Sequence, residues 1–320
     1  MAVEGETEAR VAANSRNILQ SFILVGGIGA IMALCAYVLW GRSGVVWGFV
    51  LIGGLLLISP RIAPEIIMRM YGARRIGPAE GLAVLRIVEQ LARRAGLPVP
   101  PQLYVIPSPI INAFATGVQS SSLLAVTQGL LSRLNERELV GVLAHEMAHI
   151  RHNDLWIMSL ADTMSRFTHF MSMLGVLLFI FSLPATLLGG QSFPLTGILL
   201  LYFAPTISNL LQLGLSRARE YDADLEGARL SGDPEALASA LQKIETAQGR
   251  MWETIFMPGR NVPVPSILRT HPPTEERVRR LRQFHAPTRP PVPATGAEVL
   301  GSHFAPPRAA PRYHLTGLWY

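Results

Sequence analysis

The sequence carries little charge for its length and almost no cysteine or lysine. Charged residues make up 16% of the 320 positions, whereas hydrophobic residues make up 49%. From Phe167 to Ser216 there is no Asp, Glu, Lys or Arg. A soluble domain normally carries more charge, so this composition excludes an ordinary soluble domain and indicates membrane spans. The single cysteine, Cys35, excludes a disulfide framework within the chain.

Arginine carries nearly all of the positive charge. Lys243 is the only lysine, and basic residues outnumber acidic ones by 28 to 22. A basic balance can indicate a nucleic-acid partner, but these arginines are scattered or stand beside apolar segments. Contact with a lipid bilayer explains this distribution better, so no nucleic-acid partner is expected.

The apolar runs predict about four transmembrane helices. A helix of about 20 residues crosses the hydrocarbon core of a bilayer, and we expect such helices at 19–40, 45–58, 168–188 and 194–214. Arginines flank these segments at positions 10, 16, 61, 69, 74, 75, 166, 217 and 219. The positive-inside rule therefore predicts that both termini and the segments between the hairpins are cytoplasmic. A buried hairpin inside a soluble protein is the alternative for 166–215.

One five-residue motif, H-E-M-A-H, begins at His145. Because His145 and His149 are four residues apart, both imidazoles would point to the same place from one face of a helix. Glu146 lies beside them, which completes the H-E-x-x-H pattern of two zinc ligands and a carboxylate that accepts a proton from water. Asn135 and Glu138 have the spacing of a capping box where this helix would begin. A chance match is the alternative, and the predicted helix argues against it.

A zinc site of this kind needs a third protein ligand. The metzincin pattern is excluded, because His152 and Leu155 stand where that class has its glycine and third histidine. Further along the chain, S-R-A-R-E-Y-D-A-D places Glu220 and Asp224 one helical turn apart. One of them can bind zinc while the other accepts a hydrogen bond from a zinc-binding histidine, and the spacing alone leaves both assignments open.

With these motifs the sequence resembles the integral-membrane gluzincins, which comprise the HtpX-type quality-control proteases and the CAAX prenyl endopeptidases. The resemblance covers residues 75–285. It includes N-A-F-A-T-G, which begins at Asn112, and H-P-P, which begins at His271 and is followed by Arg277. It implies a gluzincin-like protease domain with a small sheet beside the zinc helix.

The resemblance also implies roles for individual residues. It makes Glu220 the third ligand of one zinc ion per chain, with Asp224 as the supporting carboxylate, and His271 a group that stabilises the transition state. The residues Asn112, Ala113, Phe114 and Ala115 would form an edge strand that pairs with the substrate backbone. From the sequence alone, without the resemblance, Asn112 is interpreted as a turn residue and His271 as a residue that shapes the start of a helix.

The predicted fold class is α+β and mainly α-helical, with short strands at 103–106, 113–117 and 123–126. The chain divides into an N-terminal transmembrane hairpin (1–60), the first half of the protease domain with the zinc helix (61–165), a second transmembrane hairpin (166–215), the second half of the protease domain (216–285) and a proline-rich, disordered tail (286–320).

These observations predict a membrane-embedded zinc endopeptidase. It would hydrolyse membrane or membrane-associated proteins at the cytoplasmic face of a bacterial inner membrane, in stress response and protein quality control. The small number of apolar runs favours the HtpX type, because the CAAX endopeptidases have more spans. A zinc-binding pseudoprotease that acts as a scaffold is an alternative against which the intact Glu146 argues, and a soluble metallopeptidase is another. No oligomeric state is predicted.

Overall fold

The computed structural model describes residues 2–188, 195–256, 273–284 and 290–293. The chain forms two compact units that are each built from two separate stretches of sequence. Unit 1 comprises Met1–Ser59 and Trp156–Ala218, and unit 2 comprises Pro60–Leu155 and Arg219–Tyr320. Helices dominate and one four-stranded sheet is present, which confirms the predicted α+β, mainly helical class.

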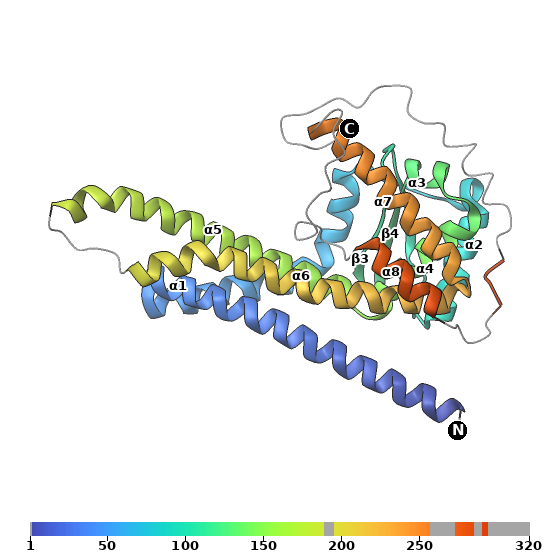
Figure 1. Ribbon diagram of the computed structural model, residues 1–320, viewed down its shortest axis with the longest axis horizontal. Coiled ribbons are helices and arrows are strands. Elements are labelled where there is room, and N and C mark those ends of the chain that lie inside the picture. The colour runs from blue at the N-terminus through green and yellow to red at the C-terminus, as the bar shows by residue number, and fades with distance from the viewer. Residues whose placement is uncertain (1, 189–194, 257–272, 285–289, 294–320) are drawn as a thin grey trace. The chain divides into compact units, whose positions relative to one another are not determined.

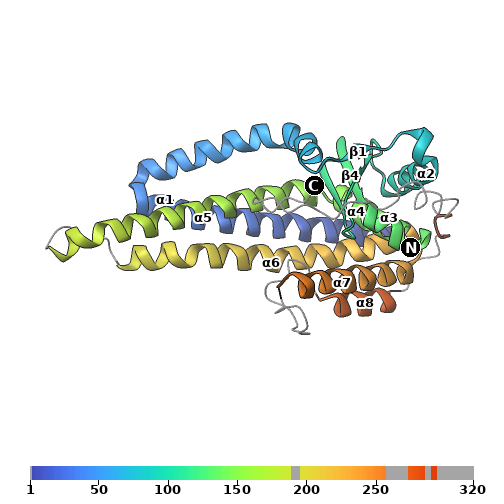
Figure 2. The same ribbon diagram turned by 90° about the horizontal axis from the view of Figure 1, so that it is seen from above.

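Unit 1 is a bundle formed by parts of three long helices, α1 (Ala2–Met70), α5 (Asp154–Leu187) and α6 (Leu195–Ser231), as Figures 1 and 2 show. The bundle has an apolar core, made of Leu24, Ile28, Met32, Cys35, Ala36, Leu160, Ala161, Met164, Met171, Leu201 and Ala204. Helix α1 bends at Gly41, whose φ of 64° is readily adopted by glycine. The bend lies where the sequence predicts a turn between the first two spans.

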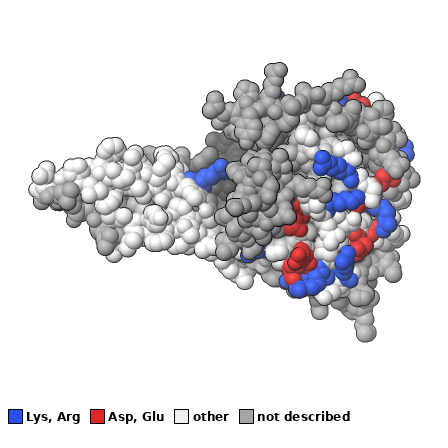
Figure 3. All heavy atoms as spheres, turned by 45° about the horizontal axis from the view of Figure 1, so that its top comes forward, with Lys and Arg blue, Asp and Glu red and all other residues white. Residues whose placement is uncertain are grey.

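Three helical segments in the described part of the chain are long and apolar enough to cross a bilayer, namely Leu19–Val50, Thr163–Pro184 and Thr196–Ser231. In the most apolar 18-residue stretch of each segment, only 28%, 22% and 18% is buried. Most of each stretch therefore remains available for contact with lipid. Figure 3 accordingly shows few charged side chains on the visible face of unit 1. The expected span 45–58 begins within the first segment, beyond Gly41, and the count of four spans stays a prediction.

The sheet of unit 2 consists of β1 (Arg74–Arg75), β2 (Gln102–Ile106), β3 (Ala113–Val118) and β4 (Ser121–Thr127), in the order β1-β2-β4-β3. Strands β2 and β4 are parallel, whereas β1 and β3 run antiparallel to their neighbours. The pairing of Ala113 with Val126 and of Val118 with Ser121 makes β3 and β4 a hairpin. All three strands predicted from the sequence are present, and β3 lies at an edge of the sheet.

The described part of unit 2 contains the ends of α1, α5 and α6. It also contains α2 (Pro78–Ala95), α3 (Gln128–Arg133), α4 (Glu136–Arg151), α7 (Pro234–Phe256) and α8 (Thr274–Gln283). Helix α4 lies in the main core, where Leu143, Met147 and Ile150 are almost fully buried. The predicted capping box is present, because Asn135 Oδ1 accepts from the Glu138 N–H and Glu138 Oε2 accepts from the Asn135 N–H, both at 2.9 Å. This helix is therefore fixed by its packing and by its cap.

Part of the segment expected to be a disordered tail is packed on unit 2. Of residues 286–320, the structure describes 290–293. Val292 is buried, and its N–H donates to the carbonyl oxygen of Ser231 at 3.0 Å. Arg94 Nη2 donates to the carbonyl oxygen of Pro290 at 2.9 Å. Residues 290–293 thus pack on this unit, and the division of the chain at residue 285 stays a prediction.

Candidate active site

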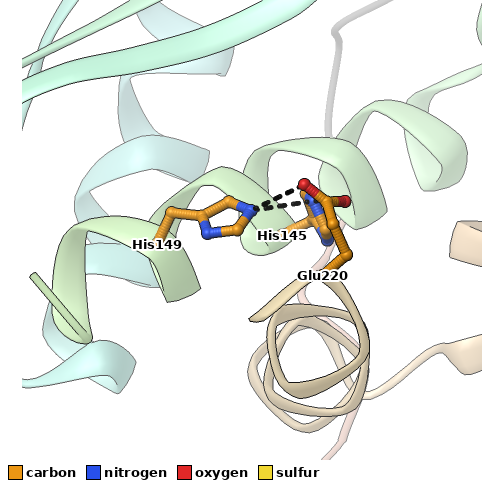
Figure 4. Close-up of side chains that lie close together, drawn as sticks. All are labelled: His145, His149 and Glu220. Atoms are coloured by element: carbon orange, nitrogen blue, oxygen red, sulfur yellow. Dashed lines mark hydrogen bonds and ion pairs between the residues drawn. The ribbon is translucent and has the colours of Figure 1, made fainter. Parts of the chain in front are cut away.

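The histidines of α4 point to a common position. His145 and His149 are one helical turn apart on this buried helix, and their Nε2 atoms lie 3.2 Å from each other. The two rings are nearly perpendicular, at 88°. Figure 4 shows both side chains directed toward the carboxylate of Glu220, which comes from α6.

The carboxylate of Glu220 completes a cluster of three donor groups. Its Oε2 lies 3.6 Å from His145 Nε2, and its Oε1 lies 3.7 Å from His149 Nε2. Helix α6 comes this close because Gly227 faces α4 without a side chain. A Cβ at Gly227 would lie only 2.9 Å from the Cα of His145. The third donor therefore depends on a close contact between two helix backbones.

This donor set has the chemistry and spacing of a zinc site. Two imidazole nitrogens and a carboxylate oxygen form a His₂Glu set, which is a known catalytic zinc set. Tetrahedral ligands at about 2.0–2.1 Å from zinc would be about 3.3 Å from each other, and the separations here are 3.2, 3.6 and 3.7 Å. Among the described residues, this is the one group of three or more His, Cys, Asp or Glu placed to hold a metal ion.

An aspartate and an arginine support His145. Its Nδ1 lies 3.1 Å from Oδ1 of Asp224, which is one turn from Glu220 on α6. Arg277, from α8, donates from Nε and Nη2 to the two oxygens of Asp224, at 2.7 and 2.6 Å. Arg277 Nη2 also lies 3.2 Å from Oε2 of Glu220. Asp224 thus faces the side of the His145 ring that is turned away from the cluster.

His149 has an equivalent pair of supporting residues, which the sequence analysis missed. Its Nδ1 lies 3.2 Å from Oδ2 of Asp154. Arg219 Nη1 donates to the other oxygen of Asp154, and both residues are buried. In the sequence, Asp154 is a single acid beyond the motif, and Arg219 belongs to the basic flank of an apolar run. The only available signal was that each stands within a few residues of a predicted ligand.

Glu146 lies next to the three donors and is bonded to the edge strand. Its Oε2 accepts a hydrogen bond from the backbone N–H of Ala115 in β3, at 3.0 Å. Burial raises the pKa of Glu146 above the usual value for a glutamate. Burial alone would lower the pKa of His145, but the facing carboxylates of Asp224 and Glu220 raise it to about 10. The same carboxylates outweigh burial at Arg277 and raise its pKa.

The residues predicted to bind substrate lie in or beside β3. Ala113, Phe114 and Ala115 belong to this strand, and Phe114 contacts the ring of Tyr71 at 5.8 Å between centroids. Asn112 precedes the strand, and its N–H donates to Thr127 Oγ1 at 3.0 Å. His271 lies outside the described residues. The structure therefore brings β3 to Glu146 and places Arg277, which follows H-P-P in the sequence, against Asp224 and Glu220.

A helix with H-E-x-x-H, a carboxylate from a second helix and an adjacent edge strand define the arrangement of a metallopeptidase. The chain belongs to peptidase family M48, whose sequence pattern matches residues 78–285. It is therefore a protease of a metallopeptidase family.

The curated relatives place the chain among the HtpX-like members, which confirms the predicted resemblance. A Protease HtpX homolog from Ralstonia pickettii (strain 12J) is 35% identical over 281 residues, which are 84% of this chain and 96% of the relative. The homologue from Desulfatibacillum aliphaticivorans is 33% identical over 313 residues, covering 90% and 98%. The homologue from Pyrococcus abyssi (strain GE5 / Orsay) is 36% identical over 285 residues, covering 83% and 95%.

One solved structure shares the fold. The crystal structure of S. mikatae Ste24p matches with a TM-score of 0.52 over 84% of this chain and 65% of that chain, at 22% sequence identity. At this identity the likeness supports the fold alone. The three apolar helical segments and the HtpX homologues support an integral membrane protein.

Proposed function

We propose that the protein is a zinc-dependent endopeptidase that cleaves membrane or membrane-associated proteins. The observation that carries this proposal is the convergence of His145 Nε2, His149 Nε2 and a Glu220 oxygen, all within 4.8 Å of one another. Zinc bound by this set supplies a Lewis acid that polarises the scissile carbonyl and lowers the pKa of a water molecule. One zinc ion per chain satisfies these donors.

The remaining residues then have distinct tasks. Glu146 accepts the proton of the attacking water and passes it to the leaving amine. Burial raises the pKa of Glu146, and a raised pKa helps this carboxylate to take up the proton. Asp224 holds the ring of His145 so that Nε2 faces the cluster. His271 is proposed to stabilise the developing oxyanion.

The proposed substrate site is the open edge of β3. A peptide added beside Ala113, Phe114 and Ala115 would hydrogen-bond through its main chain, as in β-augmentation. The Ala115 N–H is directed to Glu146, so this edge lies beside the proposed catalytic base. Recognition through the main chain predicts loose specificity for substrate side chains. Asn112 would fix the start of the strand through its bond to Thr127.

We propose that the site works at the cytoplasmic face of a bacterial inner membrane, in protein quality control. Arginines at positions 61, 69, 74 and 75, and again at 217 and 219, flank the apolar segments and support this orientation. In the sequence, the zinc helix ends at Arg151, before the apolar segment that begins at Thr163, and Glu220 lies in the last part of Thr196–Ser231, just after the charge-free run ends at Ser216. The names of the relatives support the HtpX-type role.

Purification in detergent with zinc, followed by casein and self-cleavage assays, tests this function. Glu146→Gln removes the base and keeps the three donors, so zinc content should stay near one per chain while hydrolysis falls by about a hundredfold or more. Glu136→Gln, a half-buried acid at the start of the same helix, is the control that should cleave normally. Wild-type protein without zinc, or cleavage by Glu146→Gln at the wild-type rate, would refute the proposal.

A further inference from the structure

We infer that Asp154 and Arg219 position His149 for metal binding, and that they do not merely join two helices. This inference rests on the proposed zinc site and deepens it. It adds two residues that neither the motif nor the spacing of the sequence indicates. Together with Asp224 and Arg277, they give each histidine of the cluster its own aspartate and its own arginine.

The first step is the contact between His149 and Asp154. A carboxylate oxygen 3.2 Å from Nδ1 favours the tautomer that carries its proton on Nδ1. The lone pair is then on Nε2, which is the nitrogen that lies 3.2 Å from Nε2 of His145. Histidines that bind metals typically donate their other N–H in this way, which fixes the ring and increases its basicity. Asp154 therefore sets both the orientation and the donor atom of His149.

The second step is the burial of the pair. The side chains of Asp154 and Arg219 are only 3% and 2% exposed, so neither charge is stabilised by water. A buried carboxylate needs a partner, and the guanidinium group of Arg219 supplies it through the oxygen that does not face His149. Arg219 can thus hold Asp154 in place without competing for the oxygen that His149 uses.

The third step is where the two residues lie in the chain. Arg219 directly precedes Glu220 on α6, so one short stretch of this helix supplies both the third donor and the arginine that binds Asp154. Asp154 begins α5. Unit 2 ends at Leu155 in the first of its two stretches and resumes at Arg219. The ion pair therefore joins the end of the first stretch of unit 2 to the beginning of the second.

A second ion pair in the same unit provides a matched control. Arg151 of α4 bonds Glu226 of α6, so this pair also joins neighbouring helices. The ion pairs of Glu226 are with Arg151 and Arg229, whereas Asp154 faces a histidine of the cluster. If Asp154 and Arg219 served only to join helices, removal of either pair would have the same consequences for the metal.

The experiment replaces each pair by apolar residues, since a buried ion pair can often be exchanged in this way without unfolding the protein. Asp154→Leu with Arg219→Met is compared with Glu226→Leu with Arg151→Met, in the full chain in detergent. Zinc affinity is measured by competition with a chelator, and the Co²⁺-substituted protein is examined by visible absorption. The first variant should bind zinc about 10- to 100-fold more weakly, with a changed cobalt spectrum. The control should match wild type in both.

Kinetics give a second readout. If His149 is no longer held in position, kcat should fall at saturating zinc. KM should stay nearly unchanged, because the described residues show no contact between Asp154 and β3. A folded Asp154→Leu, Arg219→Met protein with wild-type zinc affinity and cobalt spectrum overturns the inference and leaves the proposed function intact. If wild-type protein itself binds no zinc, the proposed function fails and the inference fails with it.

A milder variant decides the matter if the apolar variant does not fold. Asp154→Ala with Arg219→Gln removes both charges and leaves no side-chain oxygen at position 154 that could accept from His149 Nδ1. Its zinc affinity should fall by about tenfold, the lower end of the range for lost supporting contacts. Wild-type affinity in this variant would show that the carboxylate of Asp154 does not act on His149, and would overturn the inference.

Discussion

Gly227→Ala is the substitution that tests most directly how the third donor reaches α4. A Cβ at Gly227 would lie 2.9 Å from Cα and 3.0 Å from N of His145. These atoms belong to the backbone of a buried helix, so they cannot rotate away. Carbon atoms in contact normally lie about 3.5–4.0 Å apart, so α6 would have to withdraw from α4 by about 0.6–1 Å.

Such a shift is large compared with the tolerances of the cluster. Asp224 Oδ1 now lies 3.1 Å from His145 Nδ1, and a shift along this direction would lengthen the distance to about 3.7–4.1 Å, beyond hydrogen-bond range. Glu220 is on the same helix, and a metal site tolerates deviations of only about 0.2 Å in its ligand distances. We expect zinc affinity to fall on the order of 10- to 100-fold. Overpacking costs about 1–3 kcal/mol and the gain in helix propensity returns about 1 kcal/mol, so global stability should fall by about 0–2 kcal/mol, whereas a 10- to 100-fold loss of zinc affinity corresponds to about 1.4–2.8 kcal/mol.

The assay is chelator competition for zinc together with thermal unfolding, in detergent. Gly214→Ala is the control, because Gly214 lies on the same helix and a Cβ there would meet no atom within 4 Å. The control should bind zinc as wild type does. A Gly227→Ala protein with wild-type zinc affinity would mean that α6 does not depend on backbone contact with His145, and the reasoning about the third donor would be wrong.

Three further predictions follow from single features of the chain. Glu220→Ala should purify essentially without zinc, whereas Asp224→Ala should bind it more weakly but detectably; metal analysis after dialysis against a graded chelator would expose the reverse order and so assign the ligand to Asp224. Reporter fusions at positions 42 and 190 should read the non-cytoplasmic side and fusions at 95 and 248 the cytoplasmic side, and a cytoplasmic signal at 190 would contradict a second membrane-crossing hairpin. Burial alone would raise the pKa of Glu138, but bonds from Lys243, Ser239 and Asn135 lower it below its usual 4.5. Its contribution to stability is thus present above pH 4.5 and lost as the pH falls through the lower folded-state pKa, so Glu138→Gln should destabilise the protein at pH 7 and lose that difference in acid, as followed by denaturant unfolding.

The parts of the site that lie on one rigid element could be predicted from the sequence. His145, His149 and Glu146 follow from helical spacing alone, because their directions are fixed once α4 forms. The start of α4 follows from Asn135 and Glu138, whose capping bonds are local. The assignment of Glu220 over Asp224 needed the family resemblance, because spacing within α6 does not show which carboxylate lies beside the Nε2 atoms and which lies beside Nδ1 of His145.

Contacts between helices could not be predicted from the sequence. No spacing rule links Asp154 to Arg219, or Asp224 to Arg277, because each pair joins residues whose proximity exists only after packing. Gly227 reads as an ordinary glycine near the end of a helix until α4 is seen against it. Val292 was missed for another reason. A proline-rich composition predicts disorder on average, but a single apolar residue can still occupy a place in the core.

The charges around the two histidines explain why a divalent cation suits this cluster. Four carboxylates and two guanidinium groups surround the rings, namely Glu146, Asp154, Glu220 and Asp224 with Arg219 and Arg277. Each aspartate has its own arginine, so the excess of two negative charges falls on Glu146 and Glu220. Charges in a buried site are costly unless they are balanced. Protons can compensate for part of this excess, which agrees with the pKa of about 10 at His145. A dication would balance the two glutamates at the place where the donors converge, and Glu146 would remain an ionised base beside it.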